Sequence, residues 1–292
     1  MRTEEQSPRV ERFRGSRLHW WTYGPEPEPG TPLVVMVHGL RGTHHGLEPI
    51  VEQLPGHRVV VPDLPGFGAS TPMDGRHDVD GYAEVVTEFL DHLGAGPVVL
   101  LGHSFGSLVA ARVAARTPRL VDRLVLVNPI ATPALRGPRA VLSRLTSVYY
   151  AAAKRMPERF ARVWLSHRWV VLAASRAMVR TRDPKVRRFV HDSHLQYFSR
   201  FHSPALLSET FDASVSGTVR DDAASIAAPT LLVAGESDEI APVSGQHALA
   251  AALADARLVV VPEVGHLIHY ETPSAAAREI DAFLTTDAES SR

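Results

Sequence analysis

The sequence predicts an α/β fold, in which a mostly parallel, twisted sheet carries helices on both faces. From Leu33 onward, short apolar runs of strand length alternate with longer segments that are apolar at helical spacing. Several of the short runs are apolar at every position, which is typical of strands buried on both faces. The chain has 292 residues, 45% of them apolar, and can therefore bury one large core.

The N-terminal third of the chain supplies a strand pair, a further strand and a helix. Residues 10–15 and 17–24 are expected to form an antiparallel strand pair that turns at Gly15-Ser16. Residues 33–37 form a short apolar run, which we expect to be the first strand of the parallel sheet. Residues 82–94 are amphipathic at helical spacing and end on a glycine, a normal helix C-terminus.

A serine is predicted at a sharp corner between the next strand and the next helix. The apolar run 97–101 leads into Gly102-His103-Ser104-Phe105-Gly106, and an alanine-rich helical pattern covers 107–114. Glycines on either side of such a corner avoid the clash that a Cβ would make with nearby backbone. The corner exposes the Ser104 hydroxyl and directs the N-terminus of the following helix toward it, where the helix dipole favours negative charge.

Two further polar residues follow later strands at the same edge of the predicted sheet. The run 229–235 is followed by Asp238, and the run 256–262 is followed by His266. A serine hydroxyl needs a general base to become a nucleophile, and the base needs a carboxylate to orient it. The pattern therefore indicates nucleophilic catalysis by Ser104, with His266 as base and Asp238 as the orienting acid.

The alternation of strands and helices breaks in the middle of the chain. After the strand expected at 123–127, no strand pattern appears until Pro229, and residues 131–218 have the pattern of several helices. We therefore expect an α/β core formed by residues 1–130 and 219–292, with residues 131–218 inserted as an all-helical lid. Such a lid would cover the serine and supply most of a substrate pocket.

In chain order, Ser104, Asp238 and His266 resemble the catalytic triad of the α/β-hydrolase superfamily, in its serine esterase and lipase-like branch. Residues 38–42, His-Gly-Leu-Arg-Gly, resemble the oxyanion loop of that family. Residues 57–70 resemble its next strand and its Asp-x-x-Gly-x-Gly-x-Ser loop. The resemblance covers nearly the whole chain outside the predicted lid.

This resemblance implies an oxyanion hole and a reaction. The backbone N–H groups of Leu40 and Phe105 would hold the oxyanion of a tetrahedral intermediate, and one such donor is typically worth about 3–4 kcal/mol of barrier. We expect a serine hydrolase that cleaves a carboxylic ester-type bond of a small, largely apolar substrate through an acyl-enzyme intermediate. The nearby His38 and His103 are expected to brace loops rather than act as bases.

Several alternatives use the same residues. Glu236 is a rival for the orienting acid, although Asp238 holds the family position. Asn128 lies where some relatives carry the acid, but an amide cannot stabilise an imidazolium in that way. An acyltransferase or thioesterase shares the machinery. A carbon–carbon bond hydrolase of ring-cleavage diketo acids does so too, but it commonly has tryptophan where this chain has Leu267. A small-molecule receptor on this scaffold is the non-enzymatic alternative.

The charge is distributed unevenly along the chain. Residues 131–218 hold 15 lysines and arginines against five aspartates and glutamates, whereas the whole chain has a net charge of −1. A basic lid could favour an anionic substrate, a carrier such as coenzyme A or an acyl-carrier protein, or an anionic membrane surface. We favour the structural alternative, in which the arginines pair with the acidic core beneath them. No nucleic-acid-binding motif is present.

Composition limits the remaining classes. The chain has no cysteine, which excludes disulfides, thiolate chemistry and cysteine-based metal sites. Its 15 histidines include the pair His44-His45, but no convincing zinc spacing with carboxylates, so we expect neither metal nor other cofactor. The polar N-terminus and the lack of a long apolar stretch lead us to expect a soluble, cytoplasmic protein without a transmembrane segment. The sequence does not indicate an oligomeric state.

Overall fold

The computed structural model describes residues 7–26, 31–133 and 140–285, with the backbone alone for residues 140–144. The described residues form an eight-stranded sheet with the strand order β1-β2-β4-β3-β5-β6-β7-β8. The strands are β1 (Arg9–Phe13), β2 (Ser16–Tyr23), β3 (Val34–Val37), β4 (Val59–Pro62), β5 (Val98–His103), β6 (Val121–Val127), β7 (Thr230–Gly235) and β8 (Ala256–Val261). Pairing is antiparallel from β1 to β2 and from β2 to β4, and parallel in the rest of the sheet.

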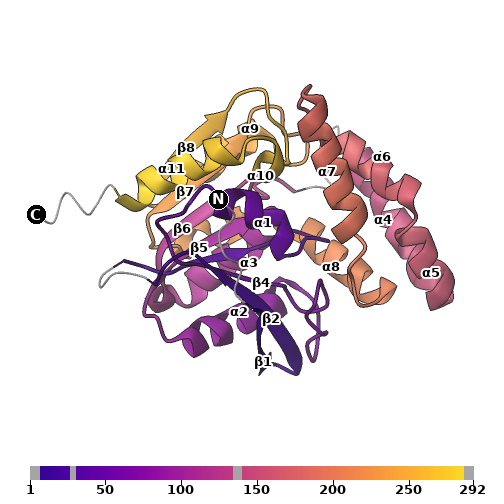
Figure 1. Ribbon diagram of the computed structural model, residues 1–292, viewed down its shortest axis with the longest axis horizontal. Coiled ribbons are helices and arrows are strands. Elements are labelled where there is room, and N and C mark those ends of the chain that lie inside the picture. Colours follow the sequence, from indigo (N-terminus) through magenta and orange to yellow (C-terminus); the bar gives the residue numbers. More distant parts are fainter. Residues whose placement is uncertain (1–6, 27–30, 134–139, 286–292) are drawn as a thin grey trace, which may run out of the picture.

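Helices surround this sheet, as the sequence predicts for an α/β fold (Figure 1). They are α1 (His44–Val51), α2 (Val79–Leu93), α3 (Phe105–Arg116), α4 (Ala140–Arg155), α5 (Glu158–Leu165), α6 (Arg168–Met178), α7 (Pro184–Tyr197), α8 (Pro204–Ser216), α9 (Val243–Ala250), α10 (Ile268–Glu271) and α11 (Pro273–Thr285). Every one of them is too short or too polar to cross a membrane.

Successive residues of the central strands point to opposite faces of the sheet. In β5, Val98 and Leu100 belong to a core shared with α2 and α3. Val99 and Leu101 belong to a second core shared with α1 and α11. All four side chains are fully buried, and burying each contributes roughly 1.5–3 kcal/mol. Burial on both faces is why the predicted strands are apolar at every position.

The antiparallel pair at the N-terminus turns one residue earlier than expected. Phe13 pairs with Ser16, so Arg14 and Gly15 occupy the turn, and Ser16 is already in β2. Both turn residues have positive φ, 44° and 80°, which suits the right-handed twist of the two strands. The sequence predicts the turn at Gly15-Ser16 instead, since the positive φ of Arg14 has no sign in its residue type.

The five helices α4–α8 lie between β6 and β7 in the chain, and we call them the helical insertion. They project together to one side of the sheet, with α4, α5 and α6 farthest from the C-terminal helix α11 (Figure 1). The predicted lid began at residue 131, and residues 134–139 lie outside the described part of the chain. Two helices were not predicted from the sequence: α1, which is short and contains Pro49, and the C-terminal α11.

Candidate functional site

Ser104 occupies the corner between β5 and α3. Its backbone has φ 53° and ψ −119°, a strained conformation for a residue with a side chain. A Cβ added to Gly102 would lie 2.3 Å from the Gly106 carbonyl oxygen, and one added to Gly106 would lie 2.3 Å from that of Val37. These contacts explain the two glycines as the sequence analysis proposed, because only residues without a Cβ fit so close to neighbouring backbone.

Ser104, His266 and Asp238 meet at the carboxyl ends of β5, β8 and β7. His266 Nε2 lies 2.8 Å from Ser104 Oγ, and His266 Nδ1 lies 2.7 Å from Asp238 Oδ2. The carboxyl ends of parallel strands share one edge of the sheet, which is how residues far apart in sequence come together there. The rival acid Glu236 instead accepts a hydrogen bond from the backbone N–H of Glu263, at 3.1 Å.

The Asp238 carboxylate is buried and fully engaged. Its Oδ1 accepts the backbone N–H groups of Ile240 and Ala241 at 2.7 and 2.9 Å, which leaves Oδ2 for His266. Burial raises the pKa of Asp238, but the neighbouring His266 and these hydrogen bonds outweigh it and hold the pKa below its usual value. The carboxyl group is therefore an ionised hydrogen-bond acceptor for His266 at neutral pH.

The loop after β3 lies directly beside the serine. A Cβ built on Gly39 would lie 3.1 Å from the Cβ of Ser104, so the loop backbone approaches Ser104 closely. The next residue is Leu40, and the first residue of α3 is Phe105. Within the described part of the chain, the backbone N–H groups of Leu40 and Phe105 donate no hydrogen bond. The free N–H of Phe105 is one of the orphan donors that every helix N-terminus leaves.

The two histidines predicted to brace loops make such contacts. His38 Nε2 accepts the backbone N–H of Leu64 at 2.9 Å, so its Nδ1 carries the proton and donates to the Gly39 carbonyl at 2.8 Å. Burial lowers the pKa of His38. His103 Nε2 lies 3.3 Å from the backbone carbonyl of His266, and burial lowers the pKa of His103 to about 3.

Asn128 has a structural role that the sequence analysis missed. It is fully buried at the end of β6, and its Nδ2 donates to the carbonyls of Gly265 and His266 at 3.1 and 2.9 Å. Its Oδ1 accepts the backbone N–H of Gly235 at 2.7 Å. One amide thus joins the end of β7, which leads to Asp238, to the loop that carries His266. The asparagine was visible in the sequence, but only as an unsuitable acid.

Arg41 is the second residue that the sequence analysis missed. Its buried guanidinium reaches from the loop after β3 into the helical insertion. It donates to the carbonyls of Phe198 and Leu165, both at 2.9 Å, and to the Tyr150 hydroxyl at 3.4 Å. It also lies over the ring of Phe198, 4.7 Å from its centroid. Nothing in the local sequence distinguishes this arginine from an exposed one.

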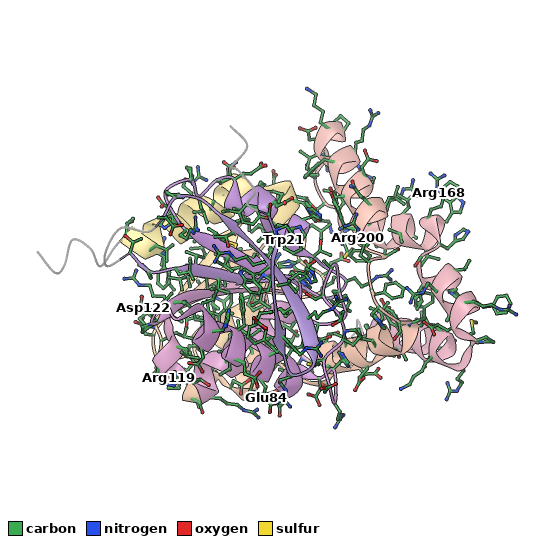
Figure 2. All side chains as sticks on the ribbon, turned by 60° about the horizontal axis from the view of Figure 1, so that its bottom comes forward. Trp21, Glu84, Arg119, Asp122, Arg168 and Arg200 are labelled. Atoms are coloured by element: carbon green, nitrogen blue, oxygen red, sulfur yellow. The ribbon has the colours of Figure 1, made fainter. Side chains whose placement is uncertain are left out.

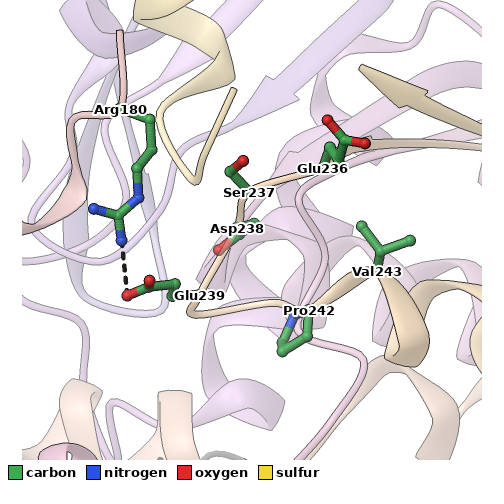
Figure 3. Close-up of a pocket in the computed structure, with 7 residues that line it drawn as sticks. All are labelled: Arg180, Glu236, Ser237, Asp238, Glu239, Pro242 and Val243. Atoms are coloured by element: carbon green, nitrogen blue, oxygen red, sulfur yellow. Dashed lines mark ion pairs between the residues drawn. The ribbon is translucent and has the colours of Figure 1, made fainter. Parts of the chain in front are cut away.

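A pocket of about 520 Å³ adjoins the loop that carries Asp238 (Figure 3). Its lining residues are Arg180, Glu236, Ser237, Asp238, Glu239, Pro242 and Val243. Figure 3 shows Arg180, from the segment between α6 and α7, paired with Glu239, and the two side chains lie 2.7 Å apart. Ser104 and His266 do not line this pocket, so we do not assign it a role in substrate binding.

One grouping in the described part of the chain has the geometry to hold a metal ion. His44, His45 and Glu48 offer ligand atoms within 4.8 Å of one another. His44 Nδ1 is hydrogen-bonded to Asp63 at 2.9 Å, and His45 Nδ1 to Glu48 at 3.2 Å. These contacts engage Nδ1 of both histidines, whereas the buried Nε2 of His44 has no hydrogen-bond partner among the described residues. We assign the grouping no function.

Comparison with known proteins identifies relatives over most of the chain. The α/β hydrolase fold family matches residues 32–273. A dihydrolipoyllysine-residue acetyltransferase component of an acetoin cleaving system, from Pseudomonas putida, is 31% identical over 95% of this chain and 69% of its own length. Lipase LipV of Mycobacterium tuberculosis is 35% identical over 50% of this chain and 56% of its own length.

Solved structures share the architecture. A hydrolase from Pseudomonas aeruginosa superimposes with a TM-score of 0.76 and 25% identity over 95% of this chain and 98% of its own. The enol-lactonase of Burkholderia xenovorans superimposes with a TM-score of 0.73 and 23% identity, over 95% of this chain and 100% of its own. Together with the family match over most of the sequence, the strand order and the serine corner show that this chain belongs to the α/β-hydrolase fold family.

Proposed function

We propose that the protein is a serine hydrolase that cleaves a carboxylic ester-type bond of a small, largely apolar substrate through an acyl-enzyme intermediate. The observation that carries the proposal is the continuous hydrogen-bond chain from Ser104 Oγ through His266 to Asp238. A histidine hydrogen-bonded to a serine on one side and a buried carboxylate on the other matches the geometry that nucleophilic catalysis requires. The family membership supports the same chemistry.

In the proposed reaction, His266 Nε2 accepts the Ser104 proton as Oγ attacks the substrate carbonyl. Asp238 orients the ring through Nδ1 and stabilises the imidazolium that forms. The imidazolium then protonates the leaving alcohol, which departs as the acyl-enzyme forms. A water molecule, deprotonated by His266, hydrolyses the acyl-enzyme and restores Ser104.

The N–H groups of Leu40 and Phe105 are proposed to stabilise the oxyanion. Leu40 follows Gly39, whose backbone is so close to Ser104 that an added Cβ would lie 3.1 Å from the Ser104 Cβ, and Phe105 is joined to Ser104 by the peptide bond. Neither is used within the described structure. Donors already in place cost no reorganisation during the reaction, and each is worth about 3–4 kcal/mol of barrier.

Acyl transfer to another acceptor is the second candidate. It shares every step up to the acyl-enzyme, and the relative from Pseudomonas putida is named for an acetyltransferase component. The other relatives include LipV and a putative carbamate hydrolase of Pseudomonas savastanoi that is 27% identical over 87% of this chain. The names of these two support hydrolysis, so we place transfer second.

The test is steady-state turnover of nitrophenyl esters of increasing acyl length by the wild type and by Ser104→Ala and His266→Ala. We expect both variants to fold normally and to lose several orders of magnitude in turnover, since each removes a member of the hydrogen-bond chain. Normal turnover by either variant would refute the assignment. If the acyl group is recovered as an ester of an added alcohol and not as free acid, the protein is a transferase. If Ser104 is covalently acylated without steady turnover, the protein is a receptor.

A further inference from the structure

The exposed apolar side chains of this protein are concentrated on the helical insertion. In the described part of the chain, ten large apolar residues are substantially exposed, and eight of them lie between residues 145 and 195. Six form the set that we call the outer apolar surface: Leu145, Val148, Phe160, Val163, Trp164 and Trp169. Their side chains are 39 to 66% exposed, which is costly for residues of this size unless a partner covers them.

The helix α5 shows that this exposure is built into the sequence. Ala161 and Leu165, four positions apart, are buried on its inner face. Phe160, Val163 and Trp164 follow the spacing i, i+3, i+4 and form an apolar stripe on the outer face. A helix that packs against its own protein on one face needs no second apolar stripe for folding. This second stripe is thus available to a surface outside the molecule.

The outer apolar surface draws its side chains from three consecutive helices, α4, α5 and α6. Helix α5 packs against both neighbours, and the rings of Tyr149 and Trp164 lie 5.9 Å apart, which joins α4 to α5. Trp169 is the second residue of α6, four residues after the end of α5. Figure 1 shows these three helices at the end of the molecule remote from α11.

The helical insertion that carries this surface is rich in basic residues. Residues 145–200 hold twelve lysines and arginines and three acidic residues. Pairing with the acidic core was the expected explanation. In the described structure, however, only Arg180 pairs with a core carboxylate, Glu239, while Arg162 pairs with Glu158 inside the insertion. Arg159 and Arg168 instead lie over the exposed rings of their neighbours, at 4.7 and 5.3 Å from the centroids, and Figure 2 shows Arg168 on the outside of the insertion.

We propose that the outer apolar surface docks on an anionic lipid bilayer. Aromatic and aliphatic side chains would enter the boundary between headgroups and acyl chains, while Arg159 and Arg168 extend along them to lipid phosphates. Each basic residue near an anionic membrane contributes about fivefold to binding. A second copy of this chain is a poor occupant, because it would present the same positive surface and be repelled.

The test measures flotation of the full chain with vesicles. We expect binding to mixed phosphatidylcholine–phosphatidylglycerol vesicles, weakening as salt is added, and little binding to pure phosphatidylcholine. Phe160→Ser with Trp164→Ser, and separately Arg159→Glu with Arg168→Glu, should each reduce binding about tenfold or more. The controls are Val10→Ser and Arg17→Glu, which change an exposed valine of β1 and an exposed arginine of β2, both outside the insertion, and should bind as the wild type does.

Three results would overturn the proposal. The first is no binding to the mixed vesicles by wild-type protein whose circular dichroism and melting are normal. The second is a similar loss of binding in the control variants, which would mean that the outer apolar surface is not the contact. The third is evidence of a different occupant. This would be either binding of soluble polyglutamate in preference to vesicles, or a dimer that analytical ultracentrifugation detects and that Phe160→Ser with Trp164→Ser abolishes. These would identify an acidic protein or a second copy as the occupant.

Discussion

At the scale of single residues, Asn128 shows how one side chain can connect two loops. Its amide satisfies three backbone groups at once. The side-chain oxygen accepts the N–H of Gly235, and the side-chain nitrogen donates to the carbonyls of Gly265 and His266. An aspartate has the same shape but no donor when ionised. The difference between the two side chains therefore tests the donor role alone.

We expect Asn128→Asp to destabilise the protein by about 2–4 kcal/mol at neutral pH and to slow ester turnover. The second carboxylate oxygen would face two carbonyl oxygens, which raises the pKa of the new carboxyl above that of the unfolded chain. The native state then binds the proton more tightly, so the stability lost relative to wild type should shrink as the pH falls to about 5. The measurement is urea unfolding of the wild type and of Asn128→Asp from neutral pH to about pH 5, which gives the difference in their free energies of unfolding at each pH.

The control for this prediction is Asn128→Gly, which suits the φ of 45° at this position and introduces no titrating group. Its loss of stability should be independent of pH. An Asn128→Asp penalty that does not change with pH would contradict the proposed donor role toward the two carbonyls.

At the scale of elements, Arg41 joins the loop after β3 to the ends of α5 and α7. Its three donors point in different directions, to Phe198, Leu165 and Tyr150, and a lysine ammonium on a flexible stem cannot reach all three. Leu40 immediately precedes it in the same loop. The position of the helical insertion and that of the proposed oxyanion donor are therefore linked through one residue.

We predict that Arg41→Lys costs about 2–3 kcal/mol of stability, because it leaves buried carbonyls without donors. Hydrogen exchange should accelerate in α5 and α7, and ester turnover should fall at the same time. The matched control is Arg58→Lys, which changes another buried arginine whose partners in the described structure are Gly24 and Glu26, both outside the insertion. Equal acceleration in both variants, or acceleration spread over the whole chain, would show that Arg41 has no specific role in holding these helices.

At the scale of the whole molecule, buried neutral histidines make stability depend on pH. Burial lowers the pKa of His103 and His194 to about 3, from an ordinary value of 6.5. Between these values the unfolded chain binds protons that the native chain excludes, so stability falls as the pH falls through that interval. Each histidine contributes roughly 1.4 kcal/mol per pH unit, and the pair removes on the order of 4 kcal/mol by about pH 5.

The measurement is the urea midpoint from about pH 7.5 to pH 5, for the wild type, His194→Gln and His167→Gln. His194 is buried and hydrogen-bonded to Ser175 at 2.8 Å, whereas His167 is exposed. We expect a shallower pH dependence for His194→Gln and an unchanged one for His167→Gln. If His194→Gln kept the full slope, the acid sensitivity would have to arise elsewhere.

Much of the architecture could be predicted because local patterns report it. The apolar runs marked the parallel strands, and the glycines around Ser104 marked the corner, since both depend on neighbours in sequence. The turn before Ser16 was misplaced by one residue because Arg14 also adopts a positive φ, which its residue type does not signal. The boundaries of the predicted lid, the catalytic roles and the cellular location stay predictions.

The sequence by itself determined the fold class, the serine corner and the order in which Ser104, Asp238 and His266 occur. Tertiary structure alone decided that these three side chains lie within hydrogen-bond distance, because their contact depends on the register of three separate strands. It also decided the contacts of Asn128 and Arg41, and it left the insertion's apolar and basic side chains exposed. Burial and long-range contact are properties of the packed chain, and residues distant in sequence carry no local sign of them.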